Sequence, residues 1–154
     1  MPIDLPPMDR HGYAGFWLRV GAGLVDSVVL LIPTMSITYL LGATTPTGIQ
    51  DPLDVLYNIL VWWVYTAALM ASPWQATLGM KACALRIVDY NGGRISFARA
   101  TGRYFAEFLA CPTLGVAFFM IAWTSRRQAL HDIIAETLVI KQATYAAFVA
   151  PPLG

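Results

Sequence analysis

The sequence predicts a single-domain, all-α integral membrane protein, and three observations favour this class. The chain has 154 residues, of which 57% are hydrophobic and only 12% are charged. A typical soluble domain is about 25% charged, and a domain of this size buries too little surface to hide so many apolar side chains from water. The charges are also unevenly spread, because segments 27–50, 55–80 and 108–125 contain none. This pattern excludes a soluble globular enzyme, a disordered chain, a coiled coil and a disulfide scaffold.

The first two apolar segments predict two full transmembrane helices, at about 13–41 and 54–72. The charge-free stretches inside them exceed the roughly 20 residues that a helix needs to cross a hydrocarbon core of ~30 Å. Residues 42–53 contain Thr, Pro and Gly and are predicted to form the connecting loop. Ser72 and Pro73 end the second helix.

The two ends of the chain are predicted to be short tails. Residues 1–12 lack the basic stretch of a signal peptide. Residues 142–154 include a Pro-Pro pair and are too short to be a domain. One membrane domain therefore remains, at 13–141.

A small β element is expected on one side of the membrane. Residues 84–89 and 137–141 are rich in β-prone side chains. Asn91-Gly92 favours a tight type I′ turn, so residues 95–97 are a candidate return strand of a β-hairpin. The segments 84–89 and 137–141 are also obvious partners for each other, which requires both on the same side of the membrane.

The distribution of basic residues predicts the topology. Loop 42–53 contains no Lys or Arg. Segment 73–107 carries Lys81, Arg86, Arg94, Arg99 and Arg103. By the positive-inside rule, 73–107 and the N-terminus are cytoplasmic and 42–53 is external. The basic loop is expected to attract anionic lipids of the bilayer.

Segment 96–123 has two interpretations, and both remain open. A plain third span would place Arg126 outside, against the positive-inside rule. A break at 111–115 (Cys-Pro-Thr-Leu-Gly) would instead give two half-helices, at about 96–110 and 115–124, that form a re-entrant hairpin. Such half-helices require protein or water around their exposed ends.

Three segments resemble a known family of bacterial membrane proteins, the RDD family. Residues 13–19 (Tyr-Ala-Gly-Phe-Trp-Leu-Arg), followed by Asp26, resemble its opening. Residues 78–81 and 85–89 resemble its central loop, and residues 127–132 (Arg-Gln-Ala-Leu-His-Asp) resemble its C-terminal segment. The three occur in order at the usual distances.

The resemblance implies an architecture more than an activity. It assigns the Arg and two Asp of the family's name to Arg19, Asp26 and Asp132. It also implies a multi-pass protein of the bacterial cytoplasmic (inner) membrane. Transport of small solutes or ions has been suggested for the family.

The acidic and basic side chains inside the apolar segments are the candidate functional residues. Asp26 lies near mid-membrane, where an ionised carboxylate is costly, so it must be protonated, paired or hydrated. It is either a proton or cation site or a structural contact between helices. Arg19 either extends to the membrane surface or pairs with Asp132 or Glu107.

A second group follows in the segment before the proposed break. Arg99, Arg103 and Glu107 recur every four residues and are predicted to share one helix face. That face either meets lipid headgroups or lines a wet vestibule, in which Arg103 or Glu107 reaches Asp26. His131 is a candidate for proton handling or for a capping role.

No catalytic template is present. The sequence has no phosphate-binding Gly loop, no His-Glu-x-x-His and no Cys/His set with zinc spacing. We therefore predict no enzymatic activity, cofactor or metal. The net charge of +1 also argues against binding nucleic acid.

Two functions remain. One is an oligomeric transporter or channel-like protein for an ion or small solute, in which Asp26 is the ion-coupled group. The other is a non-catalytic accessory subunit or assembly factor of a larger membrane complex.

Overall fold

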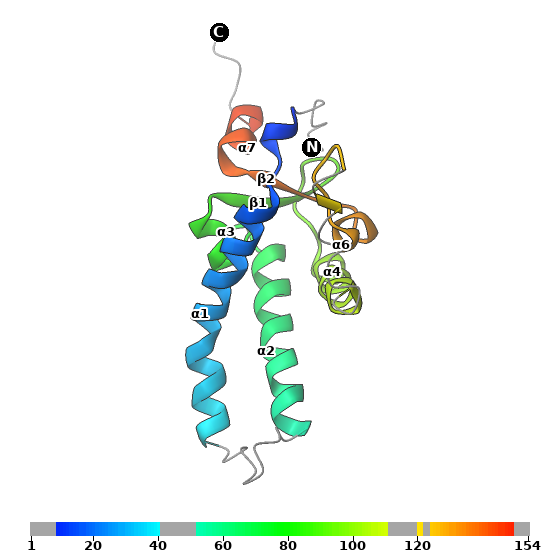
Figure 1. The fold of residues 1–154 in the computed structure, drawn as a ribbon. Coiled ribbons are helices and arrows are strands. Elements are labelled where there is room, and N and C mark those ends of the chain that lie inside the picture. The colour runs from blue at the N-terminus through cyan, green and yellow to red at the C-terminus, as the bar shows by residue number, and fades with distance from the viewer. Residues whose placement is uncertain (1–8, 41–51, 111–119, 122–123, 150–154) are drawn as a thin grey trace.

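Two long helices extend side by side from a compact group of shorter elements, which we call the head (Figure 1). The long helices are α1 (Phe16–Leu40) and α2 (Pro52–Ala71). The head contains the 3-10 helix η1 (Arg10–Gly12) together with α3, β1, α4, α6, β2 and α7. The computed structural model describes residues 9–40, 52–110, 120–121 and 124–149.

The two long helices expose most of their apolar side chains. Segments Phe16–Ser36 and Pro52–Ala71 are long and apolar enough to cross a membrane, and only 17% of each is buried within the chain. Trp17 is 79% exposed and Ile32 is 74% exposed. These faces therefore need lipid or other helices to cover them. The predicted helices at 13–41 and 54–72 are confirmed, with ends displaced by a few residues.

The sheet consists of β1 (Leu85–Asp89) and β2 (Thr137–Lys141), which pair antiparallel. Leu85 pairs with Lys141 at one end, and Asp89 pairs with Thr137 at the other. This confirms the predicted pairing of two segments that are remote in sequence.

The predicted hairpin return strand at 95–97 is wrong. A turn forms here, but it is not the predicted type I′, because Gly92 has a positive φ of 76° and Asn91 does not. The Gly92 N–H donates to the Asp89 carbonyl at 3.1 Å. The Asp89 carboxylate accepts N–H bonds from Asn91 and Gly93, which closes the turn locally. The chain then leaves the sheet: Ile95 is buried in the core, and Phe97 begins α4. The edge of β1 that a return strand would use is occupied by Gln75 and Gly93, whose carbonyl oxygens accept the N–H bonds of Ile87 and Asp89. β2 pairs along the opposite edge.

The short helix α3 (Leu78–Ala82) packs closely against α1. The Thr77 side chain caps α3 by accepting a hydrogen bond from the Met80 N–H. Gly79 lies directly against α1, where a Cβ atom would overlap the carbonyl oxygen of Ala22. Only glycine permits this approach of the two helices.

The amphipathic helix α4 (Phe97–Ala110) runs crosswise to α2 near its head end (Figure 1). Two bonds attach it to α2: Trp63 Nε1 donates to Thr101 Oγ1 at 3.1 Å, and the Tyr104 hydroxyl donates to the Ile59 carbonyl at 3.2 Å. The predicted half-helix at 96–110 is thus present. The choice between a third span and a re-entrant hairpin depends on 111–119 and 122–123, which lie outside the described residues.

Two further helices complete the head. α6 (Leu130–Ile134) packs against α4, and α7 (Gln142–Val149) follows β2 directly. α7 falls in segment 142–154, which was predicted to be a C-terminal tail. The first part of that segment is therefore helical. The buried core of the head joins residues from the sheet to the nearest turns of α1 and α2, among them Ala22, Ala67, Ile87, Ile95 and Val139.

Candidate functional site

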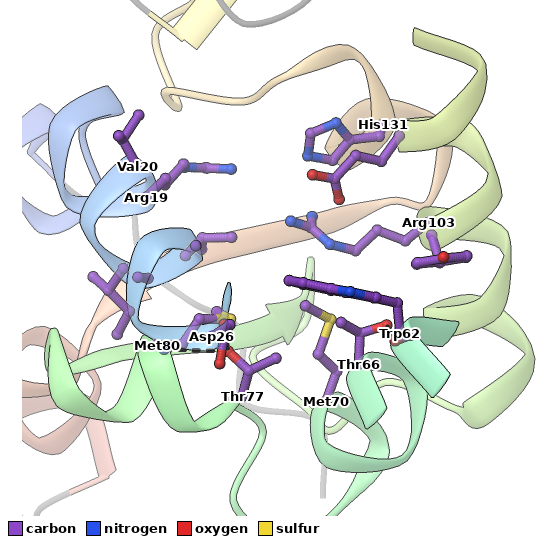
Figure 2. Close-up of a pocket in the computed structure, with 16 residues that line it drawn as sticks. Arg19, Val20, Asp26, Trp62, Thr66, Met70, Thr77, Met80, Arg103 and His131 are labelled. Carbon is purple, nitrogen blue, oxygen red and sulfur yellow. Dashed lines mark hydrogen bonds between the residues drawn. The ribbon is translucent and has the colours of Figure 1, made fainter. Parts of the chain in front are cut away.

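A cavity of about 310 Å³ lies where the head meets α1 and α2. Its titratable lining residues include Arg19, Asp26, Arg103, Glu107 and His131. Much of the remaining wall is apolar and includes Trp62, Met70, Met80, Leu85 and Val139. Figure 2 shows the guanidinium groups of Arg19 and Arg103 pointing toward each other, with Asp26 and Thr77 on another wall.

The guanidinium groups of Arg19 and Arg103 form a cationic wall of the cavity. Both bind Asp132, which has no exposed surface. Arg19 Nη1 donates to Asp132 Oδ2 at 2.5 Å, and Arg103 Nη1 forms an ion pair with Oδ1. Asp132 Oδ2 also accepts the N–H of Ala129 at 3.0 Å, at the start of α6. One carboxylate therefore binds α1 and α4 to α6. Its single negative charge faces two guanidinium groups.

Neighbouring oxygens hold the two arginines further. Arg19 Nη2 donates to the Arg127 carbonyl at 2.8 Å, and Arg103 Nη1 donates to Thr137 Oγ1 at 3.1 Å. Arg103 Nε is buried and has no hydrogen-bond partner among the described residues. Burial lowers the pKa of Arg103 to about 10, so its guanidinium group remains charged at neutral pH.

His131 lies beside this cluster and is buried, with Nε2 3.5 Å from Asp132 Oδ1. Burial lowers the pKa of His131 strongly, and the charges of Arg103 and Arg19 lower it further. His131 is therefore neutral at physiological pH. The charge of Asp132 is balanced by the arginines and not by this imidazole.

Asp26 occupies a separate wall and is held by neutral donors. The Tyr65 hydroxyl and the Gly79 N–H donate to Oδ1 at 2.6 and 2.7 Å, and the Thr77 hydroxyl donates to Oδ2 at 2.6 Å. Among the described residues, no Lys, Arg or His forms an ion pair with Asp26. The alternative in which Arg103 reaches Asp26 is wrong, because Arg103 pairs with Asp132. Glu107 lines the same cavity as Asp26.

The predicted common face of Arg99, Arg103 and Glu107 divides in two. Arg103 and Glu107 both line the cavity, although Glu107 is also exposed to solvent. Arg99 instead forms an exposed ion pair with Glu136, in which Nη2 and Oε2 are 3.3 Å apart. α6 and β2 cover only part of the α4 face, so residues at four-residue spacing meet different surroundings.

Comparison with known proteins identifies the family. The sequence model of the RDD family matches residues 13–136. The chain belongs to the RDD family. The match includes all six candidate residues, Arg19, Asp26, Arg103, Glu107, His131 and Asp132.

Relatives of this RDD protein occur in Bacillus subtilis (strain 168). The uncharacterized protein YxaI is 32% identical over 146 residues, covering 82% of this chain and 96% of YxaI. The uncharacterized protein YckC is 34% identical, covering 90% of this chain and 89% of YckC. The uncharacterized membrane protein YteJ is 27% identical, covering 88% and 85%. No solved structure matches the chain. With its two candidate spans, the chain is an RDD-family membrane protein.

Three residues that bind the charged side chains of this cavity were not predicted from the sequence: Tyr65, Thr77 and Thr137. Tyr65 lay within the second predicted helix, at about 54–72, and Thr77 lay in segment 73–107, whose basic residues were used for the topology. Thr137, which accepts from Arg103, lay in a predicted strand. A signal for Thr77 was available, because Thr before a short helix is a common N-cap. Nothing local in the sequence marked Tyr65.

The chemistry of this site is electrostatic. Among the described residues, no group of three or more His, Cys, Asp or Glu side chains is arranged to hold a metal ion. The cavity lining combines two guanidinium groups, carboxylate groups and apolar side chains. Such an arrangement suits recognition of a small charged or polar molecule.

Proposed function

We propose that this RDD-family membrane protein is a transporter or channel-like protein for an ion or small solute. The observation that carries the proposal is the cavity between α1, α2 and the head, whose walls carry buried charges of both signs. Buried ionisable groups beside membrane-spanning helices are costly, so they usually mark a pathway or a binding site. We propose no catalytic reaction, cofactor or metal.

We further propose that the protein works as an oligomer. The exposed apolar faces of α1 and α2 support this, because two helices cannot enclose a path by themselves. A path between protomers would use these faces and place the cavity at one end of it.

The proposed location is the bacterial cytoplasmic membrane, with the N-terminus and the head in the cytoplasm. The basic residues of 73–107, which belong to the head, support this orientation. Anionic lipids are the proposed partners of these side chains. A cysteine placed after Lys141 should then be shielded from an impermeant external reagent. Labelling from outside would overturn the orientation.

Within the cavity, Asp26 is the proposed ion-coupled group. Its hydrogen bonds come from hydroxyl groups and one backbone N–H, which leave its charge without a counter-ion in the described chain. The ion pair of Arg19 and Asp132 is the proposed brace or gate, because it joins α1 to α6 at the head. Glu107 stands at the exposed edge. Arg103 and His131 complete the polar network around Asp132.

The decisive experiment measures flux in liposomes. Asp26→Asn should abolish flux of the transported ion or solute while the variant still assembles, as size-exclusion chromatography can verify. Tyr57→Phe, nearer the other end of α2, is the matched control and should transport normally. Unchanged flux in Asp26→Asn would remove the proposed role of this carboxylate.

A second function is favoured by the same hydrogen bonds. The three donors that enclose Asp26 join α1, α2 and α3, as a structural contact would. The protein would then be an accessory subunit or assembly factor of a larger membrane complex. Native mass spectrometry of complexes extracted gently from the membrane separates the two. A pure homo-oligomer favours transport, and a fixed ratio with a different membrane protein favours the accessory role.

A further inference from the structure

We propose that the cavity binds a small zwitterion whose cationic and anionic groups are separated by a short apolar chain. This inference rests on the proposed function of the cavity as a solute site and names its substrate class. Two features of the cavity support it: the Asp26 carboxylate has no ion-pair partner among the described residues, and Arg19 and Arg103 share a single carboxylate on another wall.

The first observation concerns the Asp26 carboxylate, which has no ion-pair partner among the described residues. The side chain is buried and lines the cavity, and its described partners are the neutral donors Tyr65, Thr77 and Gly79. In the part of the chain that the structure describes, Oδ2 accepts one hydrogen bond, from the Thr77 hydroxyl, so it retains capacity for another donor. A buried carboxylate is stabilised when a cation pairs with it. An ammonium group of a ligand would provide that cation.

The second observation concerns the guanidinium groups of Arg19 and Arg103, which both line the cavity. They share one buried carboxylate, Asp132, so their wall carries an excess positive charge. Glu107 offsets part of this charge from its exposed position. A ligand carboxylate would offset the remaining positive charge.

The spacing favours charges that are not adjacent in the ligand. Asp26 lies on a different wall of the cavity from the guanidinium groups of Arg19 and Arg103 (Figure 2). The wall also contains the apolar side chains of Met70, Met80 and Val139. A cavity of about 310 Å³ is at the small end of ligand pockets. These features suit an ω-amino acid better than an α-amino acid.

The test measures binding to the purified full-length protein in lipid nanodiscs by titration calorimetry. Three probes of similar length are compared: 4-aminobutyrate, butyrate and butylammonium. 4-Aminobutyrate should bind most tightly, and each singly charged probe should bind on the order of tenfold more weakly, as expected for loss of one charge-assisted contact. Equal binding of butylammonium or of butyrate overturns the proposal in favour of a cation or an anion site. Absence of binding by all three also overturns it.

Variants identify the cavity as the site. Asp26→Asn should reduce 4-aminobutyrate to the affinity of butyrate and leave butyrate itself unchanged. Glu107→Gln, at an exposed position, should strengthen butyrate binding, because a competing negative charge is removed. An unchanged preference for 4-aminobutyrate in Asp26→Asn contradicts the proposal.

Two glycine variants, one that fills the cavity and one that does not, guard against the case in which a charge variant fails to fold. Gly23 lines the cavity, and a Cβ atom there meets nothing within 4 Å. Gly23→Leu should therefore fill the cavity and abolish binding. Gly102, exposed on α4, is equally open, so Gly102→Leu should bind normally. Binding retained in Gly23→Leu would place the ligand elsewhere and overturn the proposal.

This test is separate from that of transport. Binding of 4-aminobutyrate without flux would uphold the zwitterion site and reject the transporter. Flux of another solute without binding of 4-aminobutyrate would uphold the transporter and reject the zwitterion site.

Discussion

Arg19 and Asp132 lie 113 positions apart in the chain, and Arg19 Nη1 donates to Asp132 Oδ2 at 2.5 Å. Asp132 is fully buried and Arg19 nearly so, with side chains 0% and 10% exposed. The pair joins the first turn of α1 to the last helix before β2. Arg103 of α4 shares the same carboxylate. The three elements that form one end of the cavity are thus held by one acidic side chain.

Removal of this carboxylate should be strongly destabilising. Asp132→Asn removes the carboxylate with which both buried guanidinium groups form ion pairs, and loss of one member of a buried pair typically costs about 3–5 kcal/mol. We expect a large fall in the apparent melting temperature in detergent micelles. Arg99→Gln breaks the exposed pair with Glu136, whose side chains are 37% and 63% exposed, and should cost less than about 1 kcal/mol. Similar losses in both variants would contradict the structure.

The contact of α1 with α3 depends on the absence of a side chain at Gly79. A Cβ atom there would overlap the Ala22 carbonyl oxygen and lie 2.8 Å from Asp26 Oδ2. Gly79→Ala should therefore destabilise the protein by about 3 kcal/mol, at the upper end of overpacking effects. In Gly102→Ala the new methyl group meets nothing within 4 Å, and this variant should be stabilised by about 0.5–1 kcal/mol in helix α4. Thermal unfolding of both variants tests whether the melting temperature falls in Gly79→Ala and rises in Gly102→Ala.

The Tyr65 hydroxyl connects α2 to both Asp26 and α3. It donates to Asp26 Oδ1 and accepts the Leu78 N–H at 3.2 Å. Tyr65→Phe removes both bonds and should lower the free energy of unfolding by about 1–3 kcal/mol. Tyr57→Phe in the same helix should change it little. Equal stability of Tyr65→Phe and the parent protein would show that the hydroxyl is not needed to hold Asp26.

Stability should fall as the solution is acidified below neutrality because of His131. Its pKa in the folded protein is far below the ordinary value of 6.5, so only the unfolded chain binds a proton there between pH 6.5 and 5. Linkage then lowers the free energy of unfolding as pH falls, by at most about 1.4 kcal/mol per pH unit.

The check uses the two histidines of the chain in parallel. Melting temperatures are measured at pH 7 and pH 5 for the parent protein, His131→Gln and His11→Gln. The loss at pH 5 should shrink in His131→Gln and persist in His11→Gln. A loss of equal size in both variants would exclude His131 as its source.

Parts of the site were predictable because they follow from residue type and family motif. The ion pair of Arg19 was expected with either Asp132 or Glu107, and the structure has the first. The placement of Arg103 was not predictable from its spacing. Arg99, Arg103 and Glu107 share a periodicity, but only the packing of α6 and β2 on α4 buries Arg103 and leaves Glu107 exposed.

The sequence by itself determined the local features of this protein. The lengths of the apolar segments predicted α1 and α2, and β-prone composition predicted both strands, because hydrophobicity and backbone preference act over neighbouring residues. The turn at Gly92 was local as well.

Only the tertiary structure decided which elements meet. The predicted pairing of β1 with β2 formed, but the return strand at 95–97 did not, because the Gln75 carbonyl accepts the Ile87 N–H at that edge of β1. The tertiary structure also brought Tyr65 and Thr77 to Asp26, from 39 and 51 positions away. Such contacts depend on the packing of whole helices against one another, which the order of residues along one helix does not encode.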